Sequence, residues 1–142
     1  MRTFLFLVSI ALFLLFSCTS NKNFGNENTE KLTSDTIHIS NPDLEYDVII
    51  IDAGFTSWFN SYAKPKGFYT QSYLETRNKF WILEWNNRAR NPIQNNSNLY
   101  EMEINYDNTT NYGYNVNYMI YNYLVYFQLT NKQQLGGFQA RL

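Results

Sequence analysis

The chain has 142 residues, a length that suits one domain rather than two. Its formal net charge is -1, from 11 Lys and Arg against 12 Asp and Glu, so it lacks the basic excess typical of nucleic-acid binding. Aromatic residues make up 18% of the chain, which argues against a disordered protein. One Cys and one His exclude an internal disulfide and a Cys/His zinc cluster, and no cofactor or metal is expected.

The N-terminus has the pattern of a signal peptide, which we assign to residues 1–17. Residues 1–3 carry one positive charge, and residues 4–16 are apolar apart from Ser9. A membrane-spanning helix needs about 20 apolar residues, so this run is too short to span a bilayer. It has the length of the apolar region of a signal peptide.

The apolar run ends in Leu15-Phe16-Ser17-Cys18, which resembles the lipobox of bacterial lipoproteins. The resemblance implies that the Cys18 thiol takes a diacylglyceryl group and that a signal peptidase cleaves between Ser17 and Cys18. Two or three acyl chains on Cys18 would hold the mature chain firmly on a membrane, where one chain gives only marginal anchoring. An ordinary secreted protein with a chance Cys, or a short N-terminal anchor, is the alternative.

Residues 18–42 are expected to form the lipidated Cys and a flexible tether. Asn, Ser, Thr and Glu dominate there, and apolar residues are not spaced periodically before Ile37. No acidic cluster follows Cys18, which favours a periplasm-facing protein over a surface-exposed one. Asp35-Thr36-Ile37 resembles the O-glycosylation acceptor of Bacteroidota, so Thr36 is a candidate site, with a chance match as the alternative.

The folded domain is expected to span residues 43–142 and to open with a strand and a short helix. Tyr46 to Asp52 is rich in β-branched residues and apolar on both faces, which predicts a strand covered on both sides. Thr56 or Ser57 is expected near the start of the helix. Four aromatic residues at helical spacing predict that helix: Phe55, Trp58, Phe59 and Tyr62.

A longer helix is expected from Thr70 or Ser72 to about Arg90. Its apolar side contains Asn78, whose amide is costly to bury without a partner. We expect neighbouring backbone to satisfy that amide, with a ligand as the alternative. Glu84 and Arg88 are spaced for an i, i+4 ion pair, with Arg77 two turns before Glu84. Anion binding by Glu84 with Arg77 and Arg88 is the alternative.

Residues 99–106 alternate between apolar and polar side chains, which predicts a half-buried strand that pairs with the first one. A last helix is expected over residues 114–134, with one main apolar face. A second stripe, Tyr114, Tyr118 and Tyr121, lies on nearly the opposite side. Since a helix needs only one buried face to dock, the stripe is either sandwiched under another element or exposed as a binding patch.

Together these elements predict a helix-rich α+β fold of order β-α-α-β-α, with a two-stranded sheet and three helices in one compact domain. A purely helical bundle is the alternative.

Short motifs across residues 44–130 carry a further resemblance. They are Asp52-Ala-Gly-Phe-Thr-Ser-Trp58, Tyr73-Leu-Glu-x-x-Asn78, Glu84-Trp85-Asn86-x-Arg88, Ile104-Asn-Tyr106, Tyr112-Gly113 and Tyr121-x-Tyr123. This set resembles a family of small Bacteroidota lipoproteins of unknown function. The resemblance implies a Gram-negative envelope setting and a single domain, but it brings no activity, ligand or catalytic residue. Ala53 and Asn105 stand where the family pattern has Pro and Asp.

The leading functional hypothesis is a lipid-anchored cell-envelope protein with a non-enzymatic structural or binding role and a protein or glycan partner. Membrane contact is expected through the lipid on Cys18, nucleic acid is not expected as a partner, and the oligomeric state is not predicted. The rival is a small envelope hydrolase that acts on glycans through Asp52 and Glu84. For Asp52, capping of the following helix or an Asx-turn is the structural alternative. The single His, His38, falls in the expected tether, so a Ser-His-Asp site is not expected.

Overall fold

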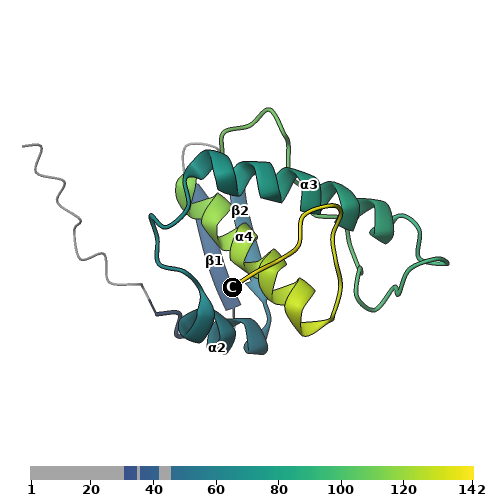
Figure 1. Ribbon diagram of the computed structural model, residues 1–142, viewed down its shortest axis with the longest axis horizontal. Helices are drawn as coiled ribbons and strands as arrows, with labels where there is room; N and C mark the ends of the chain where they lie inside the picture. Colours follow the sequence, from purple (N-terminus) through teal and green to yellow (C-terminus); the bar gives the residue numbers. More distant parts are fainter. Residues whose placement is uncertain (1–30, 35, 42–45) are drawn as a thin grey trace, which may run out of the picture.

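The computed structural model describes residues 31–34, 36–41 and 46–142. The predictions at Ser17 and Cys18 lie outside the described residues. In chain order the described elements are β1 (Thr36–Asn41), β2 (Tyr46–Ile51), α2 (Ala53–Tyr62), α3 (Gln71–Ala89) and α4 (Gly113–Thr130). The helix-rich α+β class is confirmed, with a two-stranded sheet and three helices in this part of the chain (Figure 1). The order of the elements differs from the prediction and is β-β-α-α-α.

The two strands form an antiparallel hairpin in which Thr36 lies opposite Ile51 and Asn41 opposite Tyr46. The partner of β2 is therefore residues 36–41 and not residues 99–106, and it lies inside the range assigned to the tether. The residues just before β1 also contact the fold. Leu32 exchanges two hydrogen bonds with the side chain of Asn60 on α2, at 2.9 and 2.8 Å.

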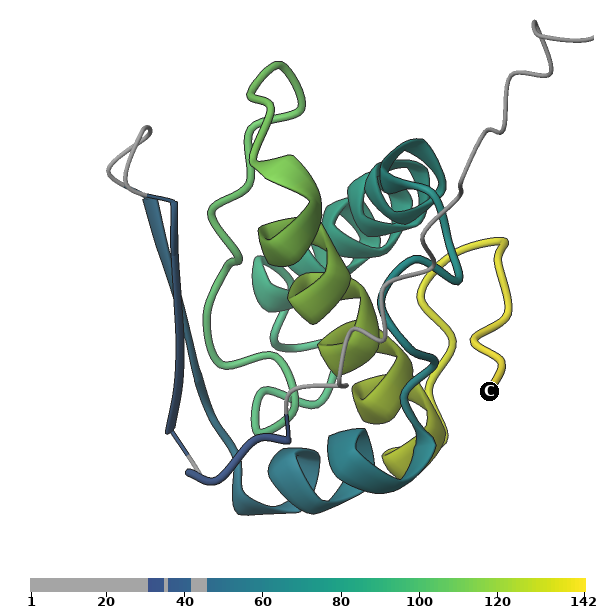
Figure 2. The same cartoon turned by 90° about the vertical axis from the view of Figure 1, so that its left-hand side faces the viewer.

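The predicted strand at residues 99–106 is irregular backbone that α3 side chains hold in place. The indole Nε1 of Trp85 donates to the carbonyl of Met102 at 2.9 Å. The Asn86 amide donates to the carbonyl of Ile104 at 2.9 Å and accepts from its N–H at 2.8 Å. The α3–α4 connection that contains these residues runs between the hairpin and the helices (Figure 2). Side-chain groups of α3 therefore take the place of a strand partner.

Only one face of β2 is packed, so the prediction of burial on both faces is wrong. Ile50 is buried, whereas its neighbours Ile49 and Ile51 are 54% and 76% exposed. A two-stranded sheet has a single layer of helices against it here, and alternate side chains of a strand point to opposite faces. The outward-facing isoleucines are therefore left in solvent.

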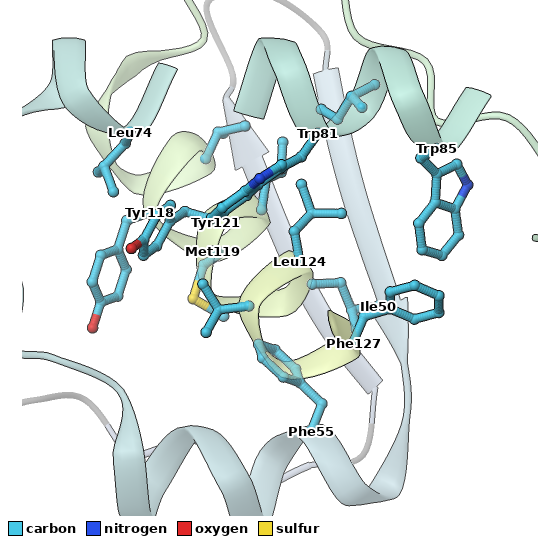
Figure 3. Packing of buried hydrophobic residues seen from close by; sticks show 14 of the residues in the cluster. Ile50, Phe55, Leu74, Trp81, Trp85, Tyr118, Met119, Tyr121, Leu124 and Phe127 are labelled. Carbon is cyan, nitrogen blue, oxygen red and sulfur yellow. The ribbon is translucent and has the colours of Figure 1, made fainter. Parts of the chain in front are cut away.

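Helix α4 is the centre of the molecule and contacts β1, α2 and α3 (Figures 1 and 2). Aromatic pairs fill its interface with α3. The Trp81 and Tyr121 rings are stacked with centroids 5.4 Å apart, and the Trp85 and Phe127 centroids lie 4.5 Å apart (Figure 3). Phe55 of α2 is fully buried on the other side of α4. In the described part of the chain, no helix combines the length and apolar character needed to span a bilayer.

The helix ends explain two differences from the predicted boundaries. Helix α2 begins before Thr56 and Ser57, because the Asp52 carboxylate accepts from the N–H groups of Gly54 and Phe55. Helix α4 ends at Thr130 rather than at residue 134. The Gln128 side chain reaches past that end and accepts from the N–H of Leu135 at 2.8 Å, which fixes the turn.

Candidate functional site

The two carboxylates of the hydrolase hypothesis lie on different elements and each has structural partners. Asp52 caps α2 and also accepts from the Tyr126 hydroxyl at 3.1 Å. Glu84 pairs with Arg88 at 2.8 Å on α3. No contact joins Asp52 to Glu84 among the described residues. The structural alternative considered for each of them therefore accounts for its position.

Arg88 connects three segments of the chain. Besides its ion pair with Glu84, it donates to the Tyr100 hydroxyl at 2.7 Å and to the carbonyl of Gln134 at 2.7 Å. A third contact runs to the Gln133 side chain at 3.3 Å. The guanidinium thus ties α3 to the connection before α4 and to the segment after it, and its donors are occupied by protein groups.

Asn78 is fully buried and belongs to a polar cluster between α3 and α4. Its amide nitrogen donates to the backbone carbonyl of Asn117 at 2.9 Å. The Asn117 side chain accepts from the Tyr106 hydroxyl at 2.7 Å and donates to the carbonyl of Gly113 at 2.8 Å. Burial raises the pKa of Tyr106, and the charge of Glu75 and the neighbouring tyrosines raise it further. Helix backbone therefore satisfies the amide nitrogen of Asn78, whereas its Oδ1 is buried without a hydrogen-bond partner among the described residues. The cluster fixes how α3 docks on α4.

The second tyrosine stripe of α4 is sandwiched, which removes the exposed-patch alternative. Tyr118 and Tyr121 are 2% and 5% exposed, and Tyr114 is half-buried. The α2–α3 connection covers them: Tyr118 donates to the carbonyl of Lys64 at 2.6 Å, and Tyr114 accepts from the N–H of Gly67 at 2.7 Å. Burial, reinforced by Tyr114, raises the pKa of Tyr118 to about 12.

Thr36, the candidate glycosylation site, is the first residue of β1 and is half-buried opposite Ile51. Its backbone N–H donates to the Ser34 hydroxyl at 3.2 Å. It therefore lies at the end of the sheet where the chain enters the fold.

A cavity of about 680 Å³ lies between α3, α4 and the C-terminal segment. We call it the arginine–aromatic pocket and define it by six of its lining residues: Tyr69, Tyr73, Arg77, Tyr121, Phe138 and Arg141. The rings of Tyr69 and Tyr73 are nearly parallel, with centroids 4.6 Å apart. The indole N–H of Trp81 donates to the carbonyl of Phe138 at 3.0 Å and so holds the C-terminal segment against α3.

The guanidinium of Arg77 is clamped between rings in this pocket. Its central carbon lies 3.7 Å from the centroid of Phe138 and 5.0 Å from that of Tyr73. Its Nη1 is buried without a hydrogen-bond partner among the described residues. An unsatisfied buried donor costs about 1–3 kcal/mol, and more for a charged group, so an acceptor brought to this nitrogen would stabilise the folded protein.

The charged side chains that line the pocket are both cationic. Arg77 and Arg141 line it, and no Asp or Glu of the described residues does. Neither arginine forms an ion pair within the described part of the chain. Burial also raises the pKa of Tyr121, and hydrogen bonding and charge interactions with Tyr69 and Tyr73 add to the shift, so the Tyr121 phenol stays neutral at ordinary pH. The arrangement offers flat rings, phenol hydroxyls and cationic donors to a polar, negatively charged ligand.

Comparison with known proteins identifies the family of the chain. A family model described as a family of unknown function (DUF6146) matches residues 5–140. The chain belongs to this family. No curated protein and no solved structure matches it. Membership in DUF6146 brings no ligand or reaction, so the chemistry of the site rests on the geometry above.

Sequence reasoning gave Arg77 a role only in the anion-binding alternative with Glu84 and Arg88, and it gave Phe138 and Arg141 none. The pocket forms because the C-terminal segment folds back onto α3 in this DUF6146 protein. One signal was available: Tyr69, Tyr73 and Arg77 recur at intervals of four, which puts the rings and the guanidinium on one side of α3 and the residues just before it. Among the described residues, no group of three or more His, Cys, Asp and Glu could hold a metal ion.

Proposed function

We propose that the protein is a lipid-anchored binding module of the bacterial cell envelope and that its arginine–aromatic pocket binds an acidic glycan. The observation that carries the proposal is the unpaired Nη1 of Arg77, buried at the wall of a cavity without acidic side chains. A uronate-type sugar supplies a planar carboxylate, which matches the fork of a guanidinium.

The other pocket residues suit the rest of a sugar ring. Tyr69 and Phe138 are half-buried, and one face of each ring is covered, by Tyr73 and by Arg77 respectively, so the opposite faces are the ones offered to the C–H face of a sugar. Gln134 and Gln139 also line the cavity and offer amides to sugar hydroxyls. The lining of this cavity is more polar than apolar, which suits a hydroxylated, charged ligand better than an apolar one.

The pocket assignment is tested by titrating the protein with oligogalacturonate and with its methyl-esterified, uncharged counterpart. We expect only the acid form to bind and Arg77→Met to weaken it at least tenfold, about 1.4 kcal/mol. Arg90→Met is the matched control, because Arg90 is exposed and pairs with Glu103 outside the pocket. Equal binding by the two arginine variants, or by the two glycans, contradicts the proposal.

The same titration addresses the hydrolase hypothesis. Release of new reducing ends from the glycan, abolished by Asp52→Asn, would favour an enzyme over a binding module. We expect no such release, because the protein contacts of Asp52 and Glu84 give each a structural role.

The anchor is a separate part of the proposal and concerns Ser17 and Cys18. We propose that cleavage before Cys18 and acylation of its thiol hold the protein on the periplasmic side of a Gram-negative, Bacteroidota-type envelope. Cys18→Ser, produced in the native host, should abolish acyl labelling and release the protein from the membrane. Membrane retention of this variant would refute the lipid anchor while leaving the pocket assignment intact.

A further inference from the structure

A second cavity, of about 530 Å³, lies along the edge of the hairpin and away from the arginine–aromatic pocket. All six residues of β2 line one side of it, and residues 102–105 line the other. Trp85, Ile120 and Leu124 belong to its apolar wall. We call this cavity the β2 slot; Figure 2 shows the α3–α4 connection running alongside the hairpin.

The backbone of β2 is unpaired on the slot side. In a two-stranded sheet β1 occupies one edge of β2, and no described hydrogen bond joins the other edge to another segment's backbone. Such an edge presents a row of N–H and C=O groups that can pair with another chain.

Residues 102–105 present a second unpaired edge to the same slot. Their groups at Met102 and Ile104 bond to Trp85 and Asn86 of α3. Glu103 and Asn105 make no backbone–backbone hydrogen bond to another segment among the described residues, and the Asn105 carbonyl faces β2, because it accepts from the Tyr46 hydroxyl at 2.5 Å.

The gap between β2 and residues 102–105 is wider than that of a direct strand pairing. Neighbouring strands lie about 4.8 Å apart, so two edges that flank an inserted strand are separated by about twice that distance. Here a whole tyrosine side chain, that of Tyr46, is needed to bridge from β2 to Asn105. Direct pairing of β2 with residues 102–105 would close this gap, and no described hydrogen bond makes that pairing.

The side chains around the slot define the chemistry of its occupant. Ile50 and Leu124 are buried beside it, while Ile49, Ile51 and Met102 are largely exposed, so apolar groups are available on both faces. Two carboxylates, Asp47 and Glu103, line the slot. Glu103 is paired with Arg90 at 3.0 Å, but Asp47 forms no ion pair within the described chain. The unmatched charge is negative.

We propose that the β2 slot binds an extended peptide segment of a partner protein as an added β-strand, with apolar side chains and a Lys or Arg placed at Asp47. Strand addition to a sheet edge is an established mode of peptide recognition, in which main-chain hydrogen bonds give affinity and pockets give specificity. This site is independent of the arginine–aromatic pocket.

The test uses the purified full chain and a fluorescent heptapeptide of alternating Val and Thr with one central Lys. Anisotropy should report binding. A copy of the peptide N-methylated at alternate residues should bind at least tenfold more weakly, because it lacks the donors of one edge. Asp47→Lys should reverse the preference between the Lys peptide and a copy with Glu in its place. Glu101→Lys, an exposed charge reversal outside the slot lining, should preserve that preference.

Several outcomes overturn the proposal. These are equal binding of the N-methylated copy, an unchanged Lys-over-Glu preference in Asp47→Lys, and no binding up to about 1 mM peptide. Protection of β2 amides that appears with rising protein concentration and without peptide would instead assign the edge to a second copy of the chain. Arg77→Met should leave peptide binding unchanged, so failure of the glycan site and failure of the slot are distinguishable.

Discussion

Asn86→Ala removes the side chain that substitutes for a strand partner of residues 102–105. The amide makes two hydrogen bonds with the backbone of Ile104, at 2.9 and 2.8 Å. Each such bond contributes about 0.5–1.5 kcal/mol net, so their loss costs about 1–3 kcal/mol. Both residues are half-buried, and water can reach the freed groups in part, which places the expected cost in the lower half of that range.

The matched control for this change is Asn87→Ala, one position along the same helix. Asn87 is exposed, and its side chain makes no hydrogen bond among those of the described residues. Both variants gain the same helix propensity from Ala, about 0.5 kcal/mol. The difference between their free energies of unfolding therefore isolates the two bonds to Ile104.

Urea denaturation of both variants measures that difference, and hydrogen exchange at the Ile104 amide locates it. We expect Asn86→Ala to be less stable than Asn87→Ala by about 1–2 kcal/mol and to exchange faster at Ile104. A difference below about 0.5 kcal/mol, or unchanged exchange at Ile104, would refute the view that the Asn86 side chain holds this segment.

Three further outcomes follow from the contacts described above. Asp52→Ala should lower the free energy of unfolding by about 0.5–2 kcal/mol through loss of the α2 cap, and Asp52→Asn should retain most of it; chemical denaturation compares the two. Arg88→Lys keeps the charge but loses the guanidinium that reaches Glu84, Tyr100 and Gln134, so urea denaturation should show a free energy of unfolding lower by about 1–3 kcal/mol. An unchanged free energy of unfolding would contradict the role of Arg88 in joining these segments. Tyr118 has a folded pKa raised from 10.0 to about 12, so the stability it contributes is complete below pH 10 and is lost as the pH rises toward 12. Tyr118→Phe should flatten that part of the stability profile between about pH 9 and pH 12; an unchanged slope would contradict the assignment.

The helices were predictable because their signals are local. Thr70 caps α3 and accepts from the N–H of Tyr73, and the helix ends just before Asn91-Pro92, as the sequence indicates. The end of α4 was not predictable, because it depends on Gln128 contacting Leu135 seven residues away in the chain. Periodicity alone continued the helix past Thr130.

The strands show what an alternating pattern leaves open. Residues 99–106 alternate, yet Met102 is 72% exposed and the segment pairs with side chains of α3. Residues 36–41 have only two apolar side chains, Ile37 and Ile39, and still form the real partner of β2. Alternation indicates which side chains share a face, but the choice of partner depends on contacts that are distant in sequence.

The candidate site was the least predictable part. The arginine–aromatic pocket exists because Phe138 is packed on Arg77 and its carbonyl accepts from Trp81, contacts that span about 60 residues. Asp52 and Glu84, the residues singled out from the sequence, have their side chains engaged in a helix cap and an ion pair. Sequence spacing identified those local pairs and gave no means of placing the C-terminal segment.

The proposed anchor at Cys18 would give the point where the chain enters the fold a mechanical consequence. Tension from the membrane would reach the double hydrogen bond between Leu32 and Asn60 before it reaches β1. Beyond that clamp, Thr36 and Ile51 form the first rung of the antiparallel ladder, so a pull on β1 opens the rungs one after another, by unzipping instead of shearing. After the Leu32–Asn60 contact opens, the hairpin would therefore unfold before the helices around α4 lose their packing.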